Sequence, residues 1–439
     1  MRLMPTVLLG VVLVAGCNAD RVTGVTQVDH QSAATVKRLH VALTISAELP
    51  EGRDLREGDT VAVTARVVDS VGADVATPDI EWHGGVFVDI SHRSAKLVVK
   101  GGTTYIIAVA VDNGVSLASA STRVDALPNA GELVIWNLDD GRITRVTPPK
   151  DAYLIAPAAM NDHDVVTGTI TYAGGVKRPF VWSRDDGFTE IPLPSPTTEG
   201  ASMGINNDGV VVGTLSSHFW NWGSVFTWSR EAGLSILDGD TSWAAAINNS
   251  GDVAGGKKGA PFLWRSTTGF TLFPGAGTAS FAGNEAYTSS AVAITDDGAV
   301  LASWTGRYAD DVDYSWIWDS YPTIWTGNTK TDLKCADCVV ADMNNAHEVV
   351  GLRWSTRTTF RWSEHTGLES LPMAEYAASK VFAINDNGVS AGAVASSAGV
   401  YRAAVWQSSG LVVMPDLSRM STSKATDIND HGHVLVYVR

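Results

Sequence analysis

One pentapeptide has the spacing of a catalytic motif. Gly200-Ala201-Ser202-Met203-Gly204 matches the pattern Gly-x-Ser-x-Gly, in which a strained turn between a strand and a helix exposes a nucleophilic serine. Here the motif runs directly into Ile205-Asn206 and an Asn-rich turn, and no helical pattern follows it. We therefore expect Ser202 to be structural. Catalysis would also need converging carboxylates, His or Tyr, and the sequence shows no such set by its spacing.

Candidate metal ligands are few. Asp310, Asp311 and Asp313 could offer carboxylate oxygens to calcium, but Asp is common in solvated loops, and that explanation is the simpler one. His431 and His433 are a close pair of histidines that straddles a turn of the repeat described below, so we interpret them as structural. No metal site and no cofactor are predicted.

Cys335 and Cys338 form a Cys-Ala-Asp-Cys pair. A zinc site would need two more ligands at suitable spacing, and none is nearby. The βαβ surroundings of a redox-active pair are also missing. Two interpretations stay open for an exported chain: a small local disulfide between Cys335 and Cys338, or two free thiols.

Aromatic residues are the better candidates for ligand binding. They occupy or flank loops that join strands, and rings gathered on one face suit stacking against sugars or a protein-binding hot spot. The alternative is that the rings pack down to close irregular strands. We favour packing for any single ring and binding for the group. The predicted ligand-binding residues are Trp220, Trp222, Trp304, Tyr308, Tyr314, Trp316 and Trp354.

These residues are embedded in a sevenfold repeat of an apolar residue, Asn (once Thr) and then Asn or Asp. The residue three after the first Asn is Gly in five copies, and Asp164 and His347 in the others; all three types tolerate a positive φ. Each copy therefore predicts a strand, a tight turn and a strand. The copies are Met160-Asn161-Asp162, Ile205-Asn206-Asn207, Ile247-Asn248-Asn249, Ile294-Thr295-Asp296, Met343-Asn344-Asn345, Ile384-Asn385-Asp386 and Ile428-Asn429-Asp430.

A series of tryptophans alternates with these turns. A glycine follows six of them at four or five residues, which predicts a second hairpin in each unit. Around Trp318 the pattern breaks, and Trp325-Thr326-Gly327 is a rival anchor. Two hairpins in each unit of 41 to 49 residues are typical of four-stranded propeller blades. The series is Trp136, Trp182, Trp228, Trp264, Trp318, Trp362 and Trp406.

The order of these hairpins predicts two unlike faces. The Asn turns and the Trp turns lie at alternate strand ends, so both belong to one face, here called the turn face. The remaining connections form the opposite loop face, where variable loops favour a binding site. Whether one blade combines both ends of the domain stays open. The loops are 171–179, 216–224, 256–260, 304–315, 353–359 and 394–402.

The segment from Ile205 to Gly213, followed by Phe226-Thr227-Trp228, resembles the bacterial extracellular repeats called HAF repeats. The pattern recurs through residues 132–439. The His-Ala-Phe triplet itself is missing: Arg178-Pro179-Phe180 and Ala260-Pro261-Phe262 stand near its place. The resemblance implies an extracellular location and a propeller-like fold, and it supplies no catalytic residues.

The N-terminus has the layout of a secretory signal. Arg2 precedes an apolar stretch that is too short to span a bilayer. Val14-Ala15-Gly16-Cys17 resembles the bacterial lipobox, which implies lipidation of Cys17; an ordinary signal peptide with a chance Cys is the alternative. By analogy, Asn18 after the Cys favours the outer membrane or the cell surface.

Two further segments precede the repeats. Residues 17–37 are polar and small and predict a tether after the signal peptide at 1–16. Residues 38–126 alternate as short strands, and Glu57 to Ala65 with Glu81-Trp82 resembles bacterial Ig-like modules. We expect Trp82 to be a core residue.

The sequence thus predicts an all-β chain, an Ig-like β-sandwich at 38–126 followed by a seven-bladed β-propeller at 132–439. A formal net charge of −15 argues against nucleic acid as a partner, because phosphates need a basic surface. The favoured function is a lipid-anchored cell-envelope protein whose loop face binds a glycan or protein without catalysis. The alternatives are a propeller-based polysaccharide lyase or hydrolase, and a purely structural envelope component.

Overall fold

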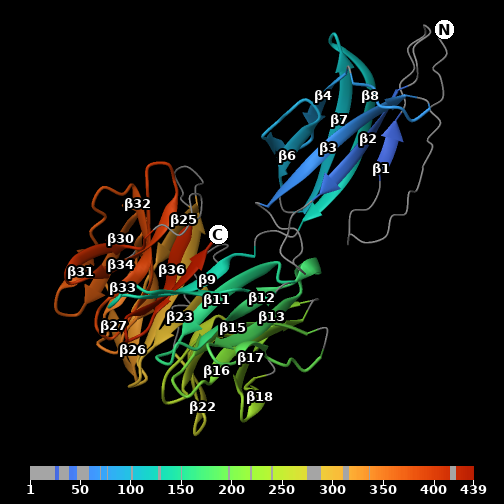
Figure 1. Cartoon of the computed structure of the whole chain (residues 1–439). Helices are drawn as coiled ribbons and strands as arrows, with labels where there is room; N and C mark the ends of the chain where they lie inside the picture. Colours follow the sequence, from blue (N-terminus) through green and yellow to red (C-terminus); the bar gives the residue numbers. More distant parts are fainter. Residues whose placement is uncertain are drawn as a thin grey trace. The chain divides into compact units, whose positions relative to one another are not determined.

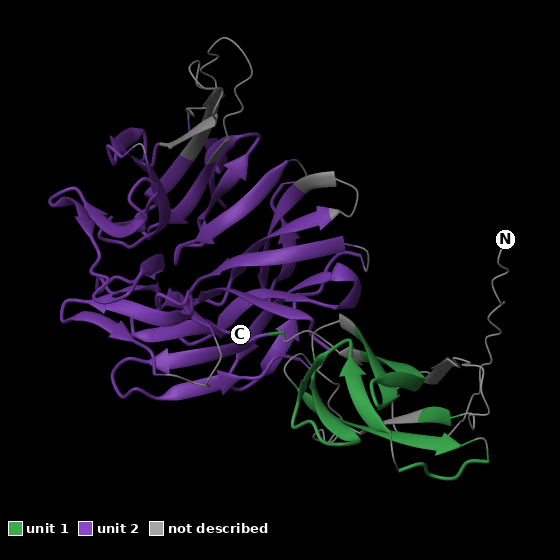
Figure 2. Cartoon of the chain, turned by 90° about the horizontal axis from the view of Figure 1, so that it is seen from above, with its two compact units in different colours: residues 1–130 green, residues 131–439 purple. Residues whose placement is uncertain are grey.

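The computed structural model of the chain is built almost entirely of strands (Figure 1). It forms two compact units, residues 1–130 and 131–439, which are coloured separately in Figure 2. The described residues contain one short 3-10 helix, Ala173–Gly175, and no helix long and apolar enough to cross a membrane. The structure describes residues 25–28, 39–46, 59–69, 71–76, 78–99, 102–126, 130–149, 151–195, 198–217, 220–238, 241–273, 288–309, 316–335, 337–415 and 422–439.

The first unit contains two antiparallel four-stranded sheets. In β3 every second residue is buried from Val61 to Val67, so one face of its sheet meets the core and the other faces water. One sheet has the order β1 (Val25–Val28), β8 (Val115–Ala126), β7 (Gly102–Asp112), β4 (Asp79–His83). The other has the order β2 (Leu39–Ser46), β3 (Thr60–Asp69), β6 (Ser94–Val98), β5 (Val86–Val88).

Two details of this unit bear on the sequence analysis. Residues 25–28 fall inside the predicted tether, yet they form β1, which pairs with β8. The polar segment thus contributes an edge strand, because the long strand β8 leaves a hydrogen-bonding edge that a short extended segment can use. Trp82 is partly buried and packs against both core clusters of the unit, as expected of a core residue.

The second unit contains seven antiparallel sheets among the described residues. Six follow the chain order and are called sheets 1 to 6; the last is called the closing sheet. Sheets 1 to 3 are β11 (Leu154–Met160), β12 (Val166–Thr171), β13 (Lys177–Ser183), β14 (Gly187–Glu190); β15 (Thr198–Ile205), β16 (Val211–Ser217), β17 (Trp220–Ser229), β18 (Gly233–Ile236); and β19 (Ser242–Ile247), β20 (Val253–Lys257), β21 (Ala260–Arg265), β22 (Gly269–Leu272).

The remaining sheets repeat this order, with one addition: in sheet 4 an extra strand, β25 (Trp316–Ser320), pairs with β24. Sheet 4 is β23 (Thr288–Ile294), β24 (Val300–Ala309), β26 (Thr323–Thr326), β27 (Thr329–Asp332). Sheets 5 and 6 are β28 (Cys338–Met343), β29 (Val349–Arg353), β30 (Thr358–Ser363), β31 (Gly367–Ser370), and β32 (Ala378–Ile384), β33 (Ser390–Ala395), β34 (Tyr401–Gln407), β35 (Gly410–Val413). The closing sheet is β10 (Ile143–Val146), β9 (Glu132–Asn137), β37 (His433–Val438), β36 (Ser423–Ile428).

The first strand of each sheet packs against the first strands of its two neighbours, and the series β11, β15, β19, β23, β28, β32, β36 returns to β11. The sheets therefore stand around a common axis with these strands innermost. This arrangement is a β-propeller. Radial repetition leaves only short outer edge strands of four residues, such as β14 and β18.

The closing sheet answers the question that the sequence left open. It joins β9 and β10 from the start of the unit to β36 and β37 from its end. His433 strengthens this junction: its Nδ1 lies 2.7 Å from Asp164 Oδ1 and its Nε2 lies 2.9 Å from Asn137 Nδ2. Because Asn137 Nδ2 can only donate, Nε2 accepts and Nδ1–H donates to Asp164. The structural interpretation of this histidine agrees with these contacts.

The two predicted turn series hold in detail. Asp164 and His347 have φ values of 58° and 59°, beside 74° at Gly209. The rivalry around Trp318 is settled by register: Trp325 pairs with Val300, just as Trp228 pairs with Val211. Trp325 is the buried member of the series, and Trp318 belongs to the extra strand β25.

Candidate functional site

The first Asn of each turn serves its own sheet and the next one. Asn206 Oδ1 accepts from Val210 N–H at 2.9 Å, which closes its turn, and Asn206 Nδ2 donates to Asn248 O of the next sheet at 3.1 Å. The same donated bond recurs from Asn161, Asn248, Asn344, Asn385 and Asn429, the last returning to Asn161 O. Thr295 lacks an amide, so the link from sheet 4 to Asn344 is missing.

The second residue of each turn forms a complete ring. The backbone N–H of each donates to the side-chain Oδ1 of the corresponding residue in the next sheet, at 2.7 to 3.0 Å, and Asp430 N–H closes the circle on Asp162. Only a side chain with a carboxylate or carboxamide oxygen can accept this bond. The members are Asp162, Asn207, Asn249, Asp296, Asn345, Asp386 and Asp430.

These turns surround a cavity of about 440 Å³ on the axis, here called the axial cup. Its wall is formed by the Asn turns and the Ile or Met before each of them, so it opens on the turn face. The sequence analysis expected a binding site on the loop face and did not foresee this cavity. The repeated second Asx, which turn formation alone does not require, was the signal that could have found it.

Negative charge is unevenly spread around the axial cup. Asp296 Oδ2 accepts from Asn249 and Asn345 amides, whereas Asp386, Asp430 and Asp162 are consecutive members with no amide between them. Burial raises the pKa of Asp430 above its ordinary value, and the charges of Asp386 and Asp162 raise it further.

Two more carboxylates lie beside the cup, on the innermost strands. Asp427 Oδ2 accepts from Met160 N–H at 2.6 Å, and Asp342 Oδ2 from Ile384 N–H at 2.9 Å. Burial raises the pKa of each to about 7, and the charge of Asp342 adds to the rise at Asp427. The corresponding residues of the other five sheets are Ala159, Gly204, Ala246, Ala293 and Ala383.

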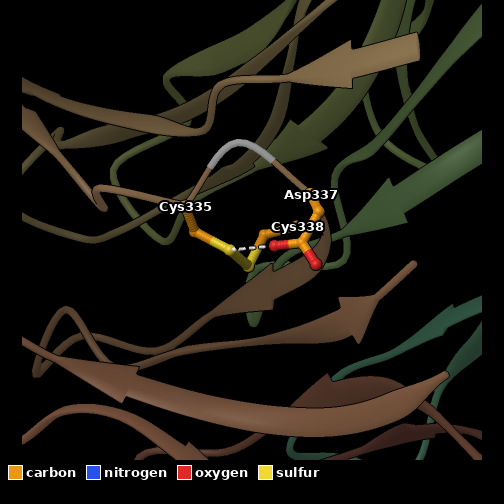
Figure 3. Close-up of side chains that lie close together, drawn as sticks. All are labelled: Cys335, Asp337 and Cys338. Atoms are coloured by element: carbon orange, nitrogen blue, oxygen red, sulfur yellow. Dashed lines mark hydrogen bonds between the residues drawn. A yellow bond between two sulfur atoms is a disulfide. The ribbon is translucent and has the colours of Figure 1, made fainter. Parts of the chain in front are cut away.

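The described carboxylates of the cup are not gathered closely enough to hold a metal ion together. Within the described part of the chain, the one close group of three ligand-type residues is Cys335, Asp337 and Cys338. Its two sulfur atoms are joined in a disulfide, and Asp337 Oδ1 lies 3.2 Å from Cys335 Sγ, as Figure 3 shows. A disulfide does not supply the thiolates that a metal would need.

The predicted aromatic residues are only partly open to inspection. Trp220 and Trp222 lie in β17, Trp304 and Tyr308 in β24, and Trp316 in β25; the side chains of all five fall outside the described part. Tyr314 and the acidic loop residues Asp310, Asp311 and Asp313 fall outside the described residues altogether, as does Cys17.

Trp354 is the described member of the aromatic set, and 59% of it is exposed. It begins the four-residue connection between β29 and β30, on the loop face. Its N–H donates to Asp337 O at 2.9 Å. Asp337 also receives hydrogen bonds from Arg353 Nη2, at 3.2 Å, and from Ser355 Oγ.

Ser202 lies within β15, is 2% exposed, and donates its hydroxyl to Gly168 O. A serine in the middle of a strand, engaged with a backbone carbonyl, has neither the exposure nor the turn that a nucleophile needs. The structural interpretation of the Gly-x-Ser-x-Gly match is therefore the right one.

No protein-family model matches the chain, and no curated protein matches it either. Among solved structures it is similar to virginiamycin B lyase from Staphylococcus aureus (12% identity, TM-score 0.42, 70% of this chain and 98% of that one). It is also similar to the β-propeller domain of the Trilobed protease from Pyrococcus furiosus (11%, 0.44, 73% and 96%) and to an oligogalacturonate lyase in complex with manganese (11%, 0.40, 78% and 87%). No activity is carried over from these proteins.

Proposed function

We propose that this chain is an exported, lipid-anchored binding protein of the bacterial cell envelope. Lipid on Cys17 would hold it at the outer membrane or cell surface, and the first unit, an Ig-like module, would act as a spacer. The second unit would be a seven-bladed propeller of the HAF-repeat type that binds a glycan or a protein on its loop face. The seven sheets, the repeated Asn turns and the lipobox-like Val14 to Cys17 support this proposal.

The exposed indole of Trp354 carries the proposal. A tryptophan that is 59% exposed on a well-anchored loop contributes little to folding, because its apolar surface stays in water. Rigid, exposed aromatic rings are the side chains that binding surfaces use as anchors. The arrangement favours binding over catalysis because Asp342 and Asp427, the buried carboxylates with raised pKa, are each engaged with backbone N–H groups of a neighbouring strand.

The first test compares residues 18–439 with a Trp354→Ala, Trp220→Ala, Trp222→Ala variant of equal thermal stability. Both are assayed against soluble glycans and purified envelope proteins. Binding by the wild type that the variant loses supports a loop-face site, and an Asp430→Asn variant on the turn face serves as the matched control. Equal binding by all three chains would remove the loop face from the proposal.

Lipid anchoring is tested separately. In a bacterial host fed a labelled fatty acid, the full chain is expected to carry the label in the membrane fraction. A Cys17→Ala variant should lose it, because the thiol is the acylated group. A labelled variant would rule out Cys17 as the anchor.

The axial cup supports a second candidate function, the binding of a small neutral or cationic molecule on the turn face. A cavity of about 440 Å³ lies within the usual size range of ligand pockets, and its carboxylates favour an ammonium group over an anion. Calorimetric titration with spermidine and glucosamine tests it. An Asp386→Asn, Asp430→Asn variant should lose the heat of binding, and no heat with the wild type would exclude these ligands.

A further inference from the structure

We propose that Trp354, Asp337, Arg353 and Ser355 form a subsite for one ring of a neutral polysaccharide. The inference rests on the proposed function, since it specifies the ligand of the loop face, and it concerns described residues alone. The stacking surface is the indole, and the polar side chains beside it supply partners for sugar hydroxyl groups.

The indole is not required by the propeller repeat. Sheet 5 already has its repeated tryptophan, Trp362, which is 6% exposed and packs in the core between sheets. Trp354 lies outside that series, at the hairpin tip formed by residues 354–357, and keeps most of its surface in water. The fold gains little apolar burial from it, which leaves binding as the better reason for a large ring at this position.

The loop that carries the ring is fixed from two sides. Trp354 N–H donates to Asp337 O, and the Asp337 carboxylate is bound by Arg353 and Ser355, the residues on either side of Trp354. Asp337 in turn lies between Cys335 and Cys338, whose disulfide is buried in the core shared by sheets 4 and 5. A ring held in this way loses little conformational freedom when a ligand binds.

The charge of the polar group selects the kind of sugar. Asp337 and Arg353 form a salt bridge at 3.2 Å, so the pair has no net charge to offer an acidic or amino sugar. Burial alone would raise the pKa of Asp337, but hydrogen bonds from Ser355 and Arg353 outweigh it and hold the pKa below its ordinary value. The carboxylate is therefore ionised at neutral pH, and it can accept hydrogen bonds from sugar hydroxyl groups.

The size of the tip separates a sugar from a protein partner. A stable protein interface buries roughly 800 Å² on each side, far more than one ring at a four-residue turn presents. A sugar ring matches the site better because its C–H face covers an indole while its edge carries hydroxyl groups. Ser355, Thr356 and Thr358 add hydroxyl groups at the same tip, the last two 2.7 Å apart.

The experiment measures binding of residues 18–439 to soluble neutral polysaccharides: dextran, mannan, galactomannan, xylan and a mixed-linkage glucan. Affinity is read by retardation in native gels and by calorimetry. We expect binding to at least one of them, weakened at least about tenfold by Trp354→Ala and retained within about threefold by Trp354→Phe, since phenylalanine keeps a stacking face. Asp337→Asn should weaken the same interaction, because the salt bridge that positions Arg353 is lost.

Leu272→Ala is the matched control: Leu272 is 47% exposed but lies on the outer strand β22. Its binding should equal that of the wild type. No binding of the wild type to any polysaccharide of the panel would overturn the inference, as would equal binding by Trp354→Ala. A protein ligand lost with Trp354→Ala, without polysaccharide binding, would overturn the sugar but leave the proposed loop-face function standing.

Discussion

At the scale of single residues, the repeated asparagines explain themselves through their two unlike atoms. The side-chain oxygen of Asn206 closes its own turn and the side-chain nitrogen reaches the next sheet. Aspartate would offer the oxygen without the donor and would add a charge to a site that is 4% exposed. The side chain therefore decides both the turn and the contact between neighbouring sheets.

Replacing Asn206 by alanine removes both bonds and leaves the Asn248 carbonyl without that donor. We expect the free energy of unfolding to fall by about 1 to 3 kcal/mol. The reverse change, Thr295→Asn, restores the missing link toward Asn344 and should raise it by about 1 kcal/mol. Urea denaturation followed by circular dichroism measures both. A destabilised Thr295→Asn variant would contradict this account of the ring.

The buried carboxylates Asp342 and Asp427 give the stability of the propeller an unusual pH dependence. Their pKa is about 7 in the folded chain and near 4 when exposed, so between these values the folded protein holds more protons than the unfolded one. By linkage, their contribution to the free energy of unfolding falls as pH rises from about 4 to about 7.

An Asp342→Asn, Asp427→Asn variant keeps the acceptor oxygens and removes the charges. It should match the wild type near pH 4 and exceed its stability above pH 7 by on the order of a few kcal/mol. Melting temperatures of both proteins between pH 4 and 8 test this, and the difference between them cancels the carboxylates elsewhere whose pKa is lowered. A constant difference across that range would show that these two groups do not titrate as described.

At the scale of elements, each innermost strand carries a β-bulge shortly before its Asn turn, as between Ser202 and Gly204 in β15. The second strand supplies a glycine beside it in five sheets. A Cβ on Gly213 would lie 2.4 Å from Ala201 O and 2.5 Å from the Phe226 ring. The bulge, the glycine and the phenylalanine thus form one packing unit.

Gly213→Ala should lower the free energy of unfolding by about 1 to 3 kcal/mol, because backbone and a buried ring must move. Gly204→Ala is the control on the first strand of the same sheet. Its Cβ would meet no atom closer than 3.4 Å, and alanine occupies the equivalent position in four other sheets. The control should be neutral or slightly stabilising. Thermal unfolding of the two variants compares them, and equal losses would contradict the packing argument.

At the scale of the whole second unit, closure depends on β37. This strand lies between β9 and β36 and so connects the last part of the unit to its first. Val434, Leu435 and Val436 are fully buried in it. Without β37 the closing sheet would separate into two hairpin halves that come from opposite ends of the unit.

A chain that ends at Asp430 should therefore lose the cooperative unfolding transition of the second unit and become sensitive to proteases. Leu435→Ala, a milder change, should keep the transition and lower the free energy of unfolding by about 2 to 5 kcal/mol. Calorimetry and limited proteolysis of both chains measure this. A truncated chain that melts like the wild type would show that the ring does not need its closing sheet.

The sequence by itself determined the repeat. Asn, Gly and Trp report local requirements, namely a side chain that closes a turn, a positive φ and a large apolar surface, and these are visible in one stretch of chain. Strand order within the sheets and the two faces of the unit followed from them. Ambiguity arose at Trp318, where an extra strand displaced the spacing, and register with Val300 was needed to identify Trp325.

Tertiary structure alone decided what happens between sheets. The axial cup, the ring from Asp162 to Asp430 and the raised pKa values of Asp342 and Asp427 depend on residues about 40 or more positions apart, or at opposite ends of the unit. Closure of the ring through β37 and the anchoring of Trp354 by Asp337 are of the same kind. Burial and charge proximity are properties of the packed ring, so no local pattern could have supplied them.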